Sequence, residues 1–186
     1  MGWLDALLGR SKVAKPDLDA LFALPSAAVT LEAATGFTPT GVGSVCFRAA
    51  EGGAFAGLER DAKALLGRDA EESTDSYGYT WMVLRRSPDD LGALVTELHA
   101  VNSTLEGAGF GPSLLCSLAG FSRAADSRRL AVVYLYKQGT FYPFAPLDGE
   151  RRDNPTELQV RGALAGELPI EPDLSRWFPV WGAPGL

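Results

Sequence analysis

Histidine and cysteine are scarce in this sequence of 186 residues, which contains one histidine, His99, and two cysteines, Cys46 and Cys116. A zinc site of the usual spacing needs more such ligands, so we expect no metal and no cofactor. Each cysteine lies within an apolar, β-like run, and no CxxC spacing is present. The sequence favours two buried free thiols over the alternative of a redox or disulfide pair.

The sequence also lacks a surplus of basic residues, because 17 Lys and Arg face 23 Asp and Glu and give a formal net charge of −6. Proteins that bind nucleic acid draw much of their affinity from a basic surface, so we expect no nucleic-acid partner.

Long apolar runs are missing as well, and none approaches the ~18 residues that a membrane-spanning helix requires. The N-terminus has no basic leader and carries Asp5 inside its apolar stretch, which is unlike a secretory signal. At 46% hydrophobic and 22% charged residues, the composition is typical of a globular protein with a sizeable core. We expect a protein of the bacterial cytoplasm.

Hydrophobic periodicity predicts a single α+β domain over residues 13–186, preceded by a short amphipathic helix within residues 1–12. Three β-like runs near residues 114–144 are joined by short connections and predict an antiparallel meander, so we expect a mainly antiparallel sheet of five or six strands packed by helices. Further helices are predicted over residues 16–24, 53–66, from Ser87 to near Gly107, and from Asp153. Strands are predicted over residues 27–32, 43–48, 77–84, 114–121, 130–136 and 140–144, with a loop over residues 68–76.

Catalytic signatures are weak. His99 lies one residue off the apolar stripe of its predicted helix, and no GxSxG or comparable nucleophile motif accompanies it. Gly107, Gly109 and Gly111 follow a helix and precede a strand, the reverse of the order that directs helix N–H groups at phosphate. We expect a non-enzymatic protein. The alternatives are a small-ligand sensor, or an enzyme whose site brings His99, an acid and Cys116 together.

Aromatic side chains are abundant in the predicted sheet. Large rings usually fill the core of a sheet, although several rings on one side could instead form an apolar binding face. The sequence leaves both interpretations open for Tyr77, Tyr79, Trp81, Tyr134, Tyr136 and Tyr142.

The two ends of the chain carry further candidate interaction residues. Trp3, Leu4, Leu7 and Leu8 share one side of the predicted N-terminal helix, which could contact a membrane surface, a partner helix or the domain itself. The Pro-rich C-terminal tail contains Trp177 and Trp181, and we favour packing of this tail on the domain over a free recognition peptide.

Several segments, among them MGWLDALLGRSK, LVTELHAVNSTLE, VVYLYKQGTFYPFAP and DLSRWFPVWGAPGL, resemble the PspAB family of PspA-associated proteins. The resemblance spans nearly the whole chain and implies a place in the phage-shock envelope-stress system, in which PspA is a membrane-remodelling coiled-coil protein. It implies a PspA-type protein or a membrane protease component as partner, and a location in the cytoplasm or at the inner face of the membrane. It supplies no active site. We therefore expect an accessory or regulatory protein that works by binding.

Overall fold

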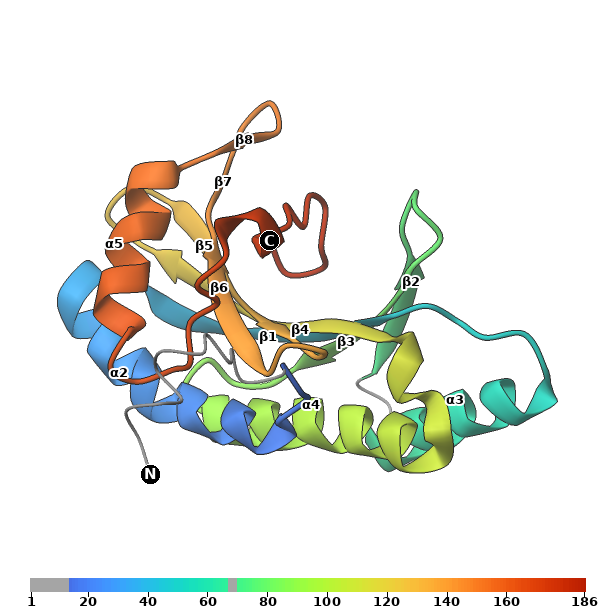
Figure 1. The fold of residues 1–186 in the computed structure, drawn as a ribbon. Helices are drawn as coiled ribbons and strands as arrows, with labels where there is room; N and C mark the ends of the chain where they lie inside the picture. Colours follow the sequence, from blue (N-terminus) through green and yellow to red (C-terminus); the bar gives the residue numbers. More distant parts are fainter. Residues whose placement is uncertain (1–13, 67–69) are drawn as a thin grey trace, which may run out of the picture.

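The computed structural model of the chain describes residues 14–66 and 70–186, and a six-stranded antiparallel sheet runs through their centre (Figure 1). The strand order is β2-β3-β1-β4-β5-β6, so β1 and β4 occupy the middle of the sheet. The prediction of an α+β fold with a mainly antiparallel sheet is confirmed. The strands are β1 (Thr38–Phe47), β2 (Glu71–Thr74), β3 (Thr80–Arg85), β4 (Leu114–Arg123), β5 (Arg128–Leu135) and β6 (Thr140–Phe144).

Helices cover one face of this sheet, and the C-terminal tail lies over part of the other (Figure 1). A small hairpin, β7 (Pro146–Leu147) and β8 (Arg151–Arg152), follows β6. The helical elements are the 3-10 turn η1 (Leu18–Ala23), α2 (Leu24–Thr35), α3 (Gly53–Leu66), α4 (Leu91–Leu105), the π turn η3 (Glu106–Phe110), the 3-10 turn η4 (Gly111–Ser113), α5 (Asn154–Leu164) and the 3-10 turn η5 (Leu174–Arg176).

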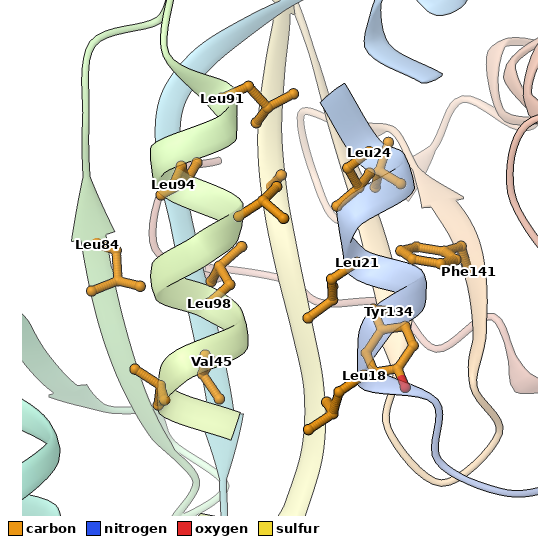
Figure 2. Close-up of a cluster of buried hydrophobic side chains, with 14 of the residues drawn as sticks. Leu18, Leu21, Leu24, Val45, Leu84, Leu91, Leu94, Leu98, Tyr134 and Phe141 are labelled. Atoms are coloured by element: carbon orange, nitrogen blue, oxygen red, sulfur yellow. The ribbon is translucent and has the colours of Figure 1, made fainter. Parts of the chain in front are cut away.

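The two faces of the sheet bury separate apolar clusters, because successive side chains of a strand point to opposite faces. In the helix-side core, leucines of η1, α2 and α4 pack over Val45, Leu84, Tyr134 and Phe141 (Figure 2). The opposite face carries a second group, which we call the tail-side cluster. It contains Cys46, Trp81, Cys116, Leu118, Ala131, Val133, Leu135, Tyr142, Phe144, Trp177 and Ala183.

The predicted strand over residues 27–32 is wrong, because this segment belongs to α2. Pro25, which directly follows the helix predicted over residues 16–24, lies in the first turn of α2, where its missing N–H costs no helical hydrogen bond. The helix ends at Gly36, whose φ of 77° lies in the left-handed region that glycine adopts readily. Its buried residues recur at helical spacing and include Leu24, Ala27, Ala28, Leu31 and Thr35.

Other boundaries also differ from the prediction: β1 begins at Thr38 rather than at Gly43, and β3 begins at Thr80 rather than at Tyr77. The helix expected from Ser87 begins at Leu91, because Asp90 is its cap and accepts a hydrogen bond from the Ala93 N–H at 3.0 Å. The segment expected as a loop over residues 68–76 contains β2, an edge strand whose four residues are exposed. A polar edge strand lacks the apolar alternation on which strand prediction depends.

The helical run Leu18–Thr35 has the length and mean hydropathy, 1.2, of a membrane span, contrary to the expectation that no run approaches this length. Core helices of soluble proteins meet the same criteria. Leu21, Leu24 and Leu31 of this run are at most 2% exposed and pack in the helix-side core, which accounts for its apolar composition.

Candidate interaction surface

Five of the twelve predicted interaction residues are interior, each at most 5% exposed. Tyr134 and Tyr136 belong to the helix-side core, whereas Trp81, Tyr142 and Trp177 belong to the tail-side cluster. These rings therefore do not gather on one side of the sheet, and their burial favours the core interpretation.

The polar end of each buried ring has a hydrogen-bond partner, as burial requires. Burial raises the pKa of Tyr134 to about 12, since it disfavours the phenolate. The Tyr134 hydroxyl accepts a hydrogen bond from the Asp17 N–H at 3.0 Å. The Tyr136 hydroxyl donates to Glu106 at 2.6 Å, and the Tyr142 hydroxyl donates to the Phe178 carbonyl at 2.8 Å. The ring N–H of Trp81 donates to the Asp75 carboxylate and that of Trp177 donates to the Glu171 carbonyl, both at 3.0 Å.

Three other predicted residues lie at the surface or at its edge. Tyr77 is 76% exposed at the turn between β2 and β3. Tyr79 is half-buried beneath Arg48, whose guanidinium lies 5.3 Å from the ring centroid. Trp181, also half-buried, packs edge-on against Phe144, so the tail contacts the sheet as the sequence favours. The remaining four predicted residues, Trp3, Leu4, Leu7 and Leu8, lie outside the described residues.

An open groove of about 480 Å³ separates the solvent side of α2 from the segment that joins β3 to α4. Val29 of α2 is 70% exposed at this groove, a large apolar exposure for a helix that otherwise packs in the core. Phe22, seven positions earlier, is 49% exposed. The lining is apolar at Pro25, Ala28, Val29, Pro39, Pro88 and Leu91, and acidic at Glu32 and Asp89.

None of the groove residues was predicted as an interaction residue. The prediction of a strand over residues 27–32 hid their common face, because a strand would have placed Ala28 and Val29 on opposite sides. The available signal was the spacing of Pro25, Ala28, Val29 and Glu32 at i, i+3, i+4 and i+7, which is typical of one helix face.

A serine, histidine and aspartate meet on the surface between η1 and α4. The His99 Nε2 lies 3.0 Å from Asp19 Oδ1, and its Nδ1 lies 3.2 Å from the Ser103 hydroxyl. Phe22 packs against the imidazole with ring centroids 4.6 Å apart.

This arrangement lacks the other parts of a nucleophilic site. Ser103 lies inside α4, so the neighbouring N–H groups are engaged by the helix rather than directed at an oxyanion. Asp19 is 85% exposed, which screens its charge, and Cys116 lies in the tail-side cluster on the other face of the sheet. The convergence of His99 with an acid and Cys116, which the enzyme alternative required, is therefore not formed. Across residues 14–66 and 70–186, no group of three or more metal-binding side chains is present.

Both cysteines are buried and free, as the sequence predicts. Cys46 of β1 and Cys116 of β4 are directly opposite each other in the strand register. The Cys116 side chain contacts that of Cys46 and, together with burial, raises the pKa of the Cys46 thiol far above its ordinary range.

Comparison with known families gives one match. The family described as PspAB, PspA associated protein B, matches residues 1–185. Neither the curated proteins nor the solved structures contain a match to the chain.

Proposed function

The chain belongs to the PspAB family, and from this premise we propose that it is a non-enzymatic accessory protein that binds a PspA-type protein. The observation that carries the proposal is the extent of the family match, which covers residues 1–185. The family description, PspA associated protein B, supports an accessory role alongside PspA.

The groove beside α2 is the part of the described surface that best suits this role. A coiled-coil protein such as PspA, as the sequence resemblance implies, offers helices, and helices commonly insert apolar side chains into a groove on the partner. The exposed Val29 supplies apolar contact area, while Glu32 and Asp89 supply negative charge at the groove. We expect the partner helix to carry basic residues next to its apolar stripe.

The N-terminal segment supplies a second contact in this proposal. Trp3, Leu4, Leu7 and Leu8 would pack against the partner or enter the membrane interface, with Arg10 and Lys12 next to anionic headgroups. The proposal includes a location in the cytoplasm at the inner face of the membrane, where a membrane protease component is a further candidate partner.

The absence of catalysis is part of the proposal and is supported by the His99 arrangement. Its serine lies inside α4 rather than at the strained strand-to-helix turn of a nucleophile elbow.

Co-purification tests the proposal in cells. Tagged wild-type protein and a Trp3→Glu, Leu7→Glu double variant are purified from stressed and unstressed cells, and bound proteins are identified by mass spectrometry. We expect the wild type to recover the PspA-type protein and the double variant to lose it while retaining its thermal stability. Absence of the PspA-type protein from every wild-type sample would contradict the proposal.

A further inference from the structure

The tail-side cluster contains two thiols that face each other across the central strand pair of the sheet. In the register of β1 and β4, Cys46 is the partner of Cys116. Their neighbours in the same row are Trp81 on β3 and Leu135 on β5. The pair is therefore enclosed by apolar side chains, and Cys46 and Cys116 are 3% and 8% exposed.

The backbone already holds these residues at a distance that a disulfide can bridge. Opposite residues of antiparallel strands have Cα atoms about 4.5 or 5.5 Å apart, and disulfides join Cα atoms about 4.4–6.8 Å apart. The pairing of β1 with β4 is irregular between Cys46 and Phe47, which gives the strand local freedom next to the thiol. From this geometry, we propose that Cys46 and Cys116 are a dithiol site that peroxide oxidises to a reversible cross-strand disulfide.

The chemistry balances with hydrogen peroxide as the oxidant. Cys116, the more exposed thiol, loses its proton and attacks one peroxide oxygen, so the O–O bond breaks, a sulfenic acid forms and one water leaves. The sulfur of Cys46 then attacks the sulfenic sulfur, and the S–S bond forms as the S–O bond breaks. The Cys46 proton leaves with the displaced hydroxide as a second water. The two thiols lose two electrons, and the peroxide gains them.

Reversibility follows from the geometry. Cβ atoms of opposite residues lie about 4.5–5.5 Å apart, whereas a disulfide prefers about 3.5–4.5 Å. The bond therefore draws the strands together, and strained disulfides are the more easily reduced ones. Because the thiolate is the attacking species, we expect the oxidation to be faster at alkaline pH than at neutral pH.

Peptide mapping of the full chain tests the inference. The folded protein is treated with hydrogen peroxide, its remaining thiols are alkylated, and its peptides are analysed without reduction. We expect a peptide that links Cys46 to Cys116, its disappearance after dithiothreitol, and a melting temperature several degrees higher in the oxidised protein, because the bond closes a long loop.

Single Cys46→Ala and Cys116→Ala variants are the matched controls, since alanine is also a small side chain that fits an apolar cluster. Cys46→Ala should leave a sulfenic acid at Cys116 that dimedone traps, and neither variant should form the linked peptide. The inference is overturned if both wild-type thiols remain alkylatable once the folded protein is opened after peroxide treatment, or if the only disulfides formed join separate molecules. These readouts do not depend on PspA binding.

Discussion

Individual buried side chains in this protein combine a large apolar surface with one satisfied polar end. Tyr136 illustrates the pattern, since its ring lies in the helix-side core and its hydroxyl donates to Glu106. The sequence could predict the ring as a sheet residue but not its partner, because Glu106 follows α4 and reaches Tyr136 only through the tertiary fold. The partner of the buried Glu171 was equally unpredictable from the sequence: its carboxylate accepts a hydrogen bond from the Thr140 hydroxyl at 2.6 Å.

Substitution of Tyr136 by Ala tests whether this residue belongs to the core or to a binding interface. Because Tyr136 is 5% exposed, we expect Tyr136→Ala to lower the free energy of unfolding by about 3–5 kcal/mol. Tyr77→Ala is the control, since Tyr77 is 76% exposed and its removal should change stability by less than about 0.5 kcal/mol. Urea denaturation measures both. Near-normal stability of Tyr136→Ala would contradict its place in the core.

Asp75 makes part of the stability dependent on pH. Partial burial opposes its charged form, but hydrogen bonds from the Trp81 ring and from the N–H groups of Tyr79 and Tyr77 outweigh this and hold the pKa of Asp75 below its ordinary value. A carboxyl with a lowered folded-state pKa contributes stability above its unfolded pKa, and this contribution is lost as the pH falls through the folded value.

We therefore expect Asp75→Asn to be less stable than the wild type at pH 7 and to approach it below about pH 4. Thermal melts of both proteins between pH 7 and pH 2.5 measure the difference. An Asp75→Asn deficit that does not shrink in acid would show that the charge of Asp75 contributes nothing.

Among the elements, α2 shows why part of the fold was not predictable from local patterns. Its β-branched residues Val29 and Thr30 favour a strand in isolation. The segment forms a helix because its apolar face packs in the helix-side core, and this tertiary packing outweighs the intrinsic strand propensity of its residues. The edge strand β2 was missed for the opposite reason, because its stability comes from pairing with β3 rather than from apolar residues.

The C-terminal tail, which contains the short turn η5, also contributes to the core. Trp177 stacks on Tyr142 of β6 with ring centroids 6.0 Å apart, and its backbone carbonyl accepts from Arg152 at 2.5 Å. We expect Trp177→Ala to cost about 3–5 kcal/mol of unfolding free energy.

Phe178 is the matched control for this tail, because it is the adjacent aromatic residue and is 57% exposed. Phe178→Ala should remain within about 0.5 kcal/mol of the wild type in the same urea titration. Equal losses in the two variants would mean that the tail is not anchored through Trp177.

For the whole molecule, the meander from β4 to β6 and the helices α3 and α5 could be predicted from periodicity, and they define the α+β class. The strand order could not, since it depends on the pairing of β1 with both β3 and β4. The groove could not be predicted because it is lined by residues of α2 and of the segment before α4, which lie far apart in the sequence. The apolar and acidic side chains that line the groove come together only when α2 packs beside that segment.

Direct binding of purified proteins tests the central claim, which is association with a PspA-type protein. The wild type, Val29→Glu and Leu65→Glu are titrated with the PspA-type protein by isothermal calorimetry. Val29 and Leu65 are 70% and 72% exposed, and Leu65 lies on α3 away from the groove, so the two variants match in exposure and added charge.

We predict saturable binding by the wild type, at least a roughly tenfold weaker affinity for Val29→Glu, and wild-type affinity for Leu65→Glu, because a charge placed in an apolar contact is costly. Equal affinity of Val29→Glu and the wild type would contradict the groove as the contact. A wild-type protein that does not bind would contradict the account as a whole.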